Sequence, residues 1–292
     1  MSPHARYRTR FAPSPTGHLH LGHAFSALTA QERAQEHGGD LLLRIEDIDT
    51  PRCKPAFETA ILEDLRWLGL DWPDPVMRQS ERMPAYRAAL DRLVRMGLCY
   101  PCACTRREIR AALSAPQEGA AGAAHPAVYP GTCRGRSMDS AGPADAIRLD
   151  MAAALARIGA PDTLGFDESG PDRTGWIPVA ATELLHRHGD VVLARRDIAT
   201  SYHLAVVVDD AAQGITEVVR GQDLFDTTAL HVLLQALLGV VRPAYHHHRL
   251  IRDTAGRRLA KRDADRALRA YRAAGTTPAE IRRLTGLAPS VA

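Results

Sequence analysis

The segment RFAPSPTGHLHLGH, residues 10–23, constrains the fold of this chain more than any other stretch. It starts as a short strand, turns at two prolines and a glycine, and delivers two histidines onto a helix predicted over Ala24–Gln35. Backbone N–H groups and the helix dipole make a helix N-terminus an anion site. We therefore predict that His20 and His23 donate hydrogen bonds to a nucleotide phosphate, and that Gly22 lets a flat base approach the backbone.

Lysine is scarce in this chain. Lys54 and Lys261 are the only two lysines among 37 basic residues. Lys261 lies in GRRLAKRD, residues 256–263, between a strand-like YHHHRLI and a helical stretch. A lysine offers a compact point charge, which suits contact with a phosphate.

These two segments resemble the two signatures of class I aminoacyl-tRNA synthetases. His20-Leu21-Gly22-His23 is similar to their HIGH motif, and the surrounding RFAPSPTG is the form found in glutamyl-specific members. The lysine segment resembles the KMSKS loop, although Arg258 replaces its first lysine and Ala260 replaces its serine. The resemblance implies that the two histidines and the lysine stabilise the phosphoryl group while ATP activates an amino acid. It places the ATP site at His20, Gly22, His23 and Lys261.

Strand and helix patterns alternate along most of the chain. We predict strands at Leu41–Asp47, 189–197, 202–210 and 214–221, and helices at Lys54–Leu68, Met83–Met96 and 224–239. This alternation predicts an α/β fold with a largely parallel sheet that binds ligands at the carboxyl ends of its strands. We interpret Asp209 and Asp210 as caps of the element that follows them.

The resemblance also implies a domain organisation. It predicts the Rossmann-type parallel sheet of a class I synthetase, an inserted zinc-bearing segment and a short helical C-terminus. We expect the catalytic domain in two halves, the insertion between them, and the KMSKS-like loop with the C-terminal helices at the end. The boundaries that we predict are 1–98 and 191–255 for the two halves, 99–190 for the insertion and 256–292 for the end.

Carboxylates follow the first predicted buried strand, where one of them is placed to bind an ammonium group. From spacing alone, Glu46 is equally compatible with a salt-bridged strand edge, which we predict for Asp49 and Arg52. The resemblance implies that Glu46 binds the α-amino group of glutamate, that Tyr202 lines its pocket and that Arg220 is directed at its carboxylates. It places the remaining glutamate contacts at Arg10, Phe11, Ala12, Pro13 and Ser14.

Three cysteines indicate a metal site. Cys102-x-Cys104, followed by Cys133 in a Gly-rich arm, favours tetrahedral zinc over a disulfide framework, and zinc needs a fourth ligand. Sulfur chemistry favours Cys99, whereas Tyr129 lies four residues before Cys133. The resemblance implies one structural zinc ion. Its ligands would be Cys102, Cys104, Tyr129 and Cys133.

Composition indicates the cellular setting. Of the residues, 45% are hydrophobic, the net charge is +3, and there is neither an apolar N-terminal stretch nor an apolar run of about 18 residues. We expect a cytoplasmic monomer without membrane contact.

The residues that follow Lys261 suffice for two short helices, at 266–275 and 277–286, and not for the anticodon-binding domain of a full glutamyl-tRNA synthetase. The chain thus resembles the short synthetase-like subfamily that glutamylates queuosine. The resemblance implies that Mg·ATP activates L-glutamate without tRNA, and that glutamate passes to queuosine at the wobble position of tRNA(Asp), held through arginine contacts to phosphates. Three alternatives stay open: a minimal synthetase that charges a tRNA 3′ end, a nucleotidyltransferase that acts on another acid, and a non-catalytic zinc and RNA-binding protein.

Overall fold

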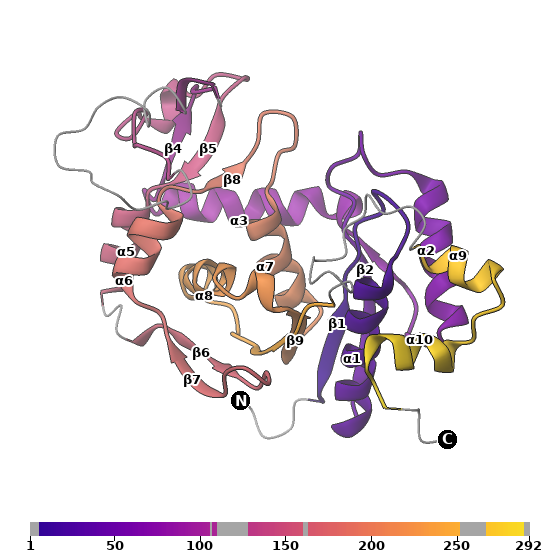
Figure 1. The fold of residues 1–292 in the computed structure, drawn as a ribbon. Coiled ribbons are helices and arrows are strands. Elements are labelled where there is room, and N and C mark those ends of the chain that lie inside the picture. Colours follow the sequence, from indigo (N-terminus) through magenta and orange to yellow (C-terminus); the bar gives the residue numbers. More distant parts are fainter. Residues whose placement is uncertain (1–5, 106, 110–127, 160–162, 252–266, 289–292) are drawn as a thin grey trace.

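The computed structural model describes residues 6–105, 107–109, 128–159, 163–251 and 267–288 (Figure 1). Two parallel sheets form its centre. The first has the order β1 (Arg8–Phe11), β2 (Asp40–Ile45) and β3 (Met77–Arg78); the second has the order β9 (Glu217–Gly221), β10 (Ala244–His248) and β6 (Gly165–Glu168), with β7 (Gly175–Pro178) antiparallel at its edge. The Thr216 N–H donates to the Arg8 carbonyl at 2.9 Å and brings β1 alongside β9. The predicted largely parallel sheet is confirmed.

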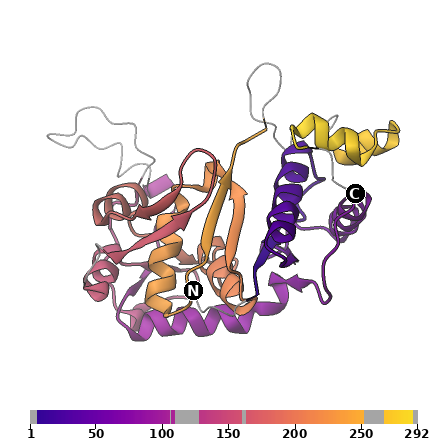
Figure 2. The same cartoon turned by 90° about the horizontal axis from the view of Figure 1, so that it is seen from below.

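Four helices agree with prediction to within a few residues: α1 (Leu21–Glu36), α2 (Pro55–Trp67), α3 (Met83–Arg95) and α8 (Thr227–Leu238). The expected C-terminal pair is also confirmed as α9 (Leu268–Ala273) and α10 (Pro278–Thr285), which lie beside α2 and α1 (Figure 2). Two shorter helices also occur. The first, α5 (Met151–Ile158), comes just before β6 in the chain, and the second, α6 (Ala181–Glu183), comes just after β7.

The helices form a hydrophobic core on each face of the sheet layer. Val218 packs in the core of α3, α5, α7 (Tyr202–Ala212) and α8, whereas the next residue, Val219, packs in the core of α1, α2, α9 and α10. Consecutive side chains of a strand point to opposite faces, so β9 is covered on both sides. Such double coverage is typical of doubly wound α/β domains.

The strand predicted at 202–210 is wrong, because these residues belong to the helix α7. The Ser201 hydroxyl caps the helix by accepting the Leu204 N–H at 3.4 Å. The following residues are buried almost throughout, and a continuous apolar run does not distinguish a buried strand from a buried helix. The strands predicted at 189–197 and 214–221 are confirmed as β8 (Val192–Ala194) and β9.

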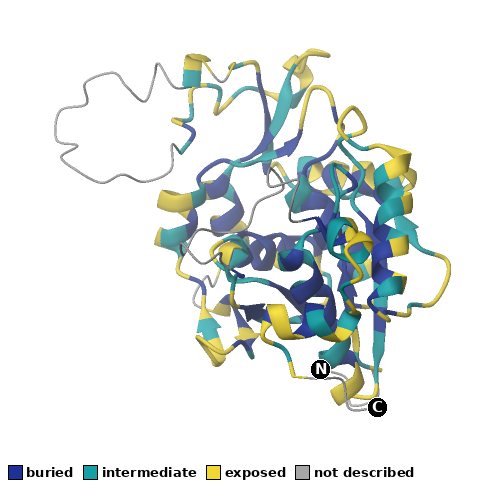
Figure 3. Ribbon diagram, turned by 45° about the vertical axis from the view of Figure 1, so that its right-hand side comes forward, coloured by how far each residue is buried: buried dark blue, intermediate teal, exposed yellow. Residues whose placement is uncertain are grey.

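A separate antiparallel sheet stands beyond α3, at the top left of Figure 1. In it, β5 (Ala146–Leu149) lies between β4 (Cys99–Cys102) and β8. The strands of the antiparallel sheet are mostly buried, like those of the parallel sheets, and exposed residues gather on the loops around it (Figure 3). Among the described residues, we find no helix with the length and apolar character that a membrane span requires.

Candidate active site

His20 and His23 cap the N-terminus of α1 and contact each other. Nδ1 of His20 accepts the Gly22 N–H at 3.0 Å, and Nδ1 of His23 accepts the His20 N–H at 3.2 Å. Because both Nδ1 atoms accept, each neutral ring carries its proton on Nε2, which makes Nε2–H the hydrogen-bond donor. A Cβ at Gly22 would lie 2.9 Å from the His20 ring, so the glycine preserves this geometry. Two ring donors thus stand where a helix favours an anion.

A cavity of about 600 Å³ opens beside these histidines, at the carboxyl ends of β1, β2 and β9. Every predicted ATP-site and glutamate-site residue that the structure describes lines it: Arg10, Phe11, Ala12, Pro13, Ser14, His20, Gly22, His23, Glu46, Tyr202 and Arg220. Lys261 and the KMSKS-like loop lie outside the described residues. The cavity therefore joins predicted site residues from four separate parts of the sequence, and His248–Ile251 add a fifth part to its lining.

A buried ion network holds Glu46 at the wall of this cavity. Nη2 of Arg44 lies 3.1 Å from Oε1 of Glu46, and Nη1 of Arg44 lies 2.7 Å from Oδ1 of Asp210. Nε of Arg10 lies 3.0 Å from the same Asp210 oxygen. Burial raises the pKa of Glu46, against the opposing effect of Arg44 and Arg10. Glu46 thus combines both of its predicted settings, an ion pair and a place in the pocket.

The interpretation of Asp209 and Asp210 as caps is wrong. Both are buried on α7, and Asp210 forms ion pairs with Arg10 and Arg44. Asp209 instead accepts hydrogen bonds from side chains that lie on or just before α3. These donors are Gln79 at 3.0 Å, Arg82 at 2.7 Å and Tyr86 at 2.7 Å. The strand predicted over 202–210 ended at these two aspartates, which made a capping role plausible. In the structure both belong to the helix α7.

Arg220 is only 5% exposed, and uncharged acceptors surround its guanidinium. Its Nε donates to Nε2 of His247 at 3.1 Å, and its Nη1 donates to Nδ1 of His231 at 3.2 Å. Its Nη2 donates to the Thr228 hydroxyl at 2.7 Å. Within the described part of the chain, no carboxylate forms an ion pair with Arg220. Burial raises the pKa of the neighbouring Tyr202, so this hydroxyl stays protonated and is a donor.

No pattern in the sequence predicted His231 and His247 as site residues. The run AYHHH of β10 indicates that alternate histidines share a face, but nothing in it identifies Arg220 as their partner. That contact depends on β9 and β10 being neighbours in the sheet, with His247 opposite Arg220 in the register.

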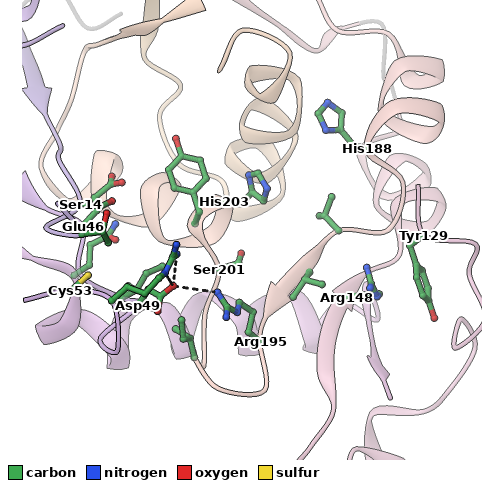
Figure 4. A pocket seen from close by; sticks show the side chains of 18 of the residues that line it. Ser14, Glu46, Asp49, Cys53, Tyr129, Arg148, His188, Arg195, Ser201 and His203 are labelled. Carbon is green, nitrogen blue, oxygen red and sulfur yellow. Dashed lines mark hydrogen bonds and ion pairs between the residues drawn. The ribbon is translucent and has the colours of Figure 1, made fainter. Parts of the chain in front are cut away.

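A second cavity, of about 680 Å³, adjoins the first (Figure 4). Ser14, Glu46 and Tyr202 line both cavities. Tyr129 and Arg148 belong to the far wall of the second cavity, where the Arg148 guanidinium stacks on the Tyr129 ring at 3.8 Å. The two cavities therefore meet at the wall formed by Ser14, Glu46 and Tyr202.

Charged side chains lie at the near side of the second cavity. A carboxylate oxygen of Asp49 is 2.5 Å from Arg52, which confirms the predicted ion pair, and 4.0 Å from Arg195 (Figure 4). Arg52 and Arg195 are both well exposed, at 71% and 41% of their side chains. This cavity thus presents cations to solvent and leads inward to Glu46 and Tyr202.

Three cysteines and a tyrosine converge at one end of the antiparallel sheet. The sulfur atoms of Cys102, Cys104 and Cys133 all lie within 4.8 Å of one another. The Tyr129 hydroxyl is 3.4 Å from the Cys102 sulfur and 3.5 Å from the Cys104 sulfur. Tetrahedral zinc, with Zn–S about 2.3 Å and Zn–O about 2.0 Å, needs ligand atoms about 3.5–3.8 Å apart. The donor set therefore fits zinc. Cys99 packs instead against the α3, α5, α7 and α8 core, so the geometry favours Tyr129 as the fourth ligand.

Comparisons with known proteins agree with this geometry. The family described as class I tRNA synthetases (E and Q), catalytic domain, matches residues 6–163 and 166–288. A glutamyl-Q tRNA(Asp) synthetase of Rhodobacter capsulatus is 57% identical over 282 residues, which cover 96% of this chain and 99% of that protein. This chain belongs to the glutamyl-Q tRNA(Asp) synthetase family. A second relative of that name, from Nitratidesulfovibrio vulgaris, is 42% identical and covers 94% of this chain and 83% of its own length.

Solved structures place the family among class I synthetases. The glutamate-tRNA synthetase of Elizabethkingia anophelis superposes with a TM-score of 0.69 and 32% identity, covering 89% of this chain and 53% of its own. This chain therefore spans about half the length of that enzyme. The methionyl-tRNA synthetase of Mycobacterium tuberculosis, at 11% identity and a TM-score of 0.60, shares the fold. The expected class I synthetase fold is confirmed.

Proposed function

We propose that this protein uses Mg·ATP to adenylate L-glutamate and then transfers the glutamate to queuosine at the wobble position of tRNA(Asp). The observation that carries this proposal is the wall of Ser14, Glu46 and Tyr202 shared by the two cavities. One cavity holds the histidine-capped helix, and the other opens towards a larger acceptor. The names of the two relatives support queuosine as that acceptor.

In the first step, the α-carboxylate of glutamate attacks the α-phosphorus of ATP and pyrophosphate leaves. His20 and His23 would donate Nε2–H groups to the phosphates, because their Nδ1 atoms accept from the backbone. Both donors are positioned before the reaction, so no reorganisation is needed as charge develops. Alignment and charge stabilisation suffice for this step, and no nucleophilic side chain is required. From the sequence, Lys261 would add a cation on the same phosphates.

Recognition of glutamate would divide between two walls of the first cavity. Glu46 would bind the α-ammonium group, because Arg44 also pairs with Asp210 and compensates only part of the Glu46 charge. Arg220 and the Tyr202 hydroxyl would take the side-chain carboxylate. Arg10 also lines this cavity, but it is already paired with Asp210. We therefore assign Arg10 mainly to the shape of the site.

In the second step, a hydroxyl of the acceptor attacks the glutamyl carbonyl and AMP leaves. The acceptor would enter through the second cavity and reach the adenylate at the shared wall. Arg52 and Arg195 stand at this entrance, where exposed guanidinium groups would hold the RNA backbone. Binding should therefore weaken as salt concentration rises.

A zinc ion held by Cys102, Cys104, Tyr129 and Cys133 would have a structural role. Protein ligands fill all four tetrahedral positions, which leaves none for a substrate. When bound, the ion fixes the turn after β4 to the segment around Cys133. Because Arg148 stacks on Tyr129, the ion would also stabilise the position of Arg148 in the wall of the second cavity.

The deciding experiment offers the protein three RNAs with ATP and labelled glutamate: tRNA(Asp) with queuosine, tRNA(Asp) without it, and tRNA(Glu). We expect label only on the queuosine-bearing RNA, and after nuclease digestion it should migrate with the modified nucleoside. Label on the 3′ adenosine of tRNA(Glu) would instead show a minimal synthetase. Glutamate-independent ATP–pyrophosphate exchange would indicate a nucleotidyltransferase for another acid. Failure of any exchange would support the non-catalytic alternative. The cytoplasmic location and the monomeric state stay predictions.

A further inference from the structure

The three arginines around the glutamate site differ in how their charge is balanced. Arg10 and Arg44 both contact Asp210, and Arg44 also contacts Glu46. Arg220 is as deeply buried as Arg10, yet the described residues supply no carboxylate to it. A buried cation of this kind strongly favours an incoming anion, because the anion removes an uncompensated charge.

Hydrogen bonding on one side of Arg220 fixes the proton of His247. Since a guanidinium only donates, Nε2 of His247 must be its unprotonated nitrogen. The proton then lies on Nδ1, which is 2.5 Å from Oε2 of Glu168. Glu168 also accepts the backbone N–H groups of His247 at 2.9 Å and Gly170 at 2.7 Å. Burial alone would raise the pKa of Glu168, but the bonds from His247 hold it below its ordinary value, so Glu168 stays ionised.

The other side of Arg220 shows the same arrangement. Nδ1 of His231 accepts from Arg220, so His231 carries its proton on Nε2 and donates to Nδ1 of His203 at 3.3 Å. Burial lowers the pKa of His231 and brings the pKa of His203 down to about 4, so both rings are neutral at pH 7. Neither histidine therefore adds a positive charge beside the guanidinium.

Four of the five N–H donors of Arg220 are used by these partners. They go to His247, His231, Thr228 and the Leu224 carbonyl, the last at 3.2 Å. Within the described chain, one N–H on Nη1 is left for a ligand. Arg220 is thus held rigidly and offers the substrate one aimed hydrogen bond with a full positive charge.

We infer that Glu168, His247 and His231 are positioning residues that keep Arg220 aimed and uncompensated, and so make the site select an anionic side chain over its amide. This inference rests on the proposed function and deepens it. Glu168 acts on Arg220 through His247, because the Glu168 charge keeps the proton of His247 on Nδ1, the side away from Arg220. Without that charge, His247 is able to turn an N–H towards the guanidinium and repel it.

The test measures ATP–pyrophosphate exchange with glutamate and with glutamine for three variants. Glu168→Gln keeps the shape but removes the charge, and His247→Leu removes the acceptor. His246→Gln is the matched control, because His246 is the preceding residue of β10 and its ring contacts Ser169 at 3.0 Å instead. We expect the KM for glutamate to rise about tenfold to a hundredfold in the first two variants, as for an unsatisfied buried hydrogen-bond group.

Other readouts separate positioning from a general structural effect. The KM for ATP of Glu168→Gln should stay near that of the unchanged protein, its melting temperature should fall without the protein unfolding at the assay temperature, and the preference for glutamate over glutamine should fall about tenfold. A parallel rise in both KM values, or an unchanged preference, would overturn the inference. If His247→Leu does not fold, Glu168→Gln decides alone. If the unchanged protein gives no glutamate-dependent exchange, the proposed function fails instead.

Discussion

Oδ1 of Asp210 lies 2.7 Å from Nη1 of Arg44, whose side chain is completely buried. The same carboxylate also pairs with Arg10. One acidic side chain on α7 therefore links β1, which carries Arg10, to β2, which carries Arg44. Arg10 lines the first cavity, and Arg44 holds Glu46 at another part of its wall. The geometry of the site therefore depends on a helix residue that does not line the cavity.

We expect Asp210→Asn to lower the free energy of unfolding by about 3–5 kcal/mol, because it leaves two buried arginines without their shared partner. Arg10 and Arg44 outweigh burial and hold the pKa of Asp210 below its ordinary value. The stabilisation is thus fully present above pH about 4 and is lost as pH falls through the lower folded-state pKa. Urea unfolding at several pH values measures both effects. Asp197→Asn, in an exposed pair with Arg195, should cost less than about 1 kcal/mol. Equal losses for the two variants would contradict this prediction.

His20 should have two separable roles, as a helix cap and as a phosphate donor. His20→Ala removes both, whereas asparagine is itself a good N-cap whose shorter side chain does not reach the position of the His20 Nε2–H, so His20→Asn keeps the cap and loses that donor. We expect His20→Ala to cost about 1 kcal/mol of stability and His20→Asn little. Both should slow glutamate-dependent exchange about a hundredfold, as for loss of one preorganised donor. Rapid exchange by His20→Asn would exclude the donor role.

Acid should destabilise the histidine pair His203 and His231. Burial lowers the pKa of His203 to about 4, whereas the unfolded chain binds the proton near pH 6.5. A depressed folded-state pKa gives stability that is present above pH about 6.5 and is lost as pH falls towards 4, by up to about 3 kcal/mol. His203→Gln should flatten the fall in unfolding free energy between pH 7 and 4.5. His186→Gln, at an exposed position, should leave that slope unchanged. An identical slope in both variants would show that His203 is not the titrating group.

Zinc content distinguishes the two candidate fourth ligands. We expect elemental analysis to find about one zinc ion per chain, and Cys104→Ser to lose it. Cys99→Ser should retain the metal, since Cys99 packs in the hydrophobic core. Tyr129→Phe should bind zinc more weakly, because water must take the fourth position. Loss of zinc from Cys99→Ser with full retention in Tyr129→Phe would reverse the ligand assignment.

The arginines at the second cavity should affect transfer and spare activation. We expect Arg52→Ala and Arg195→Ala to reduce glutamate transfer to queuosine-bearing tRNA(Asp) about tenfold each and to reduce its salt dependence. Glutamate-dependent exchange should stay within about twofold, because neither residue lines the first cavity. Arg157→Ala, on an exposed face of α5, is the control and should transfer normally. A loss of exchange matching the loss of transfer would place these arginines in the activation site.

The long motif around His20 allowed much of this protein to be predicted from its residues. Local patterns sufficed for the helix after the motif, for most of the later helices, and for Cys102, Cys104 and Cys133 as one cluster. These features depend on neighbours in the chain, on turn residues and on hydrophobic period, all of which a sequence carries directly.

Other features required the tertiary structure. The segment 202–210 became a helix because the core of α3, α5, α7 and α8 buries its apolar residues and a serine caps it, which no local period predicts. The ion pair between Asp210 and Arg10 joins residues 200 positions apart in the sequence. The contact between Arg220 and His247 forms because β9 and β10 are neighbours in the sheet. The residues of the site were thus determined by the sequence, but their charge balance was decided by folding. Burial strengthens each ion pair and penalises each unpaired group, and which groups are buried together depends on contacts between distant segments.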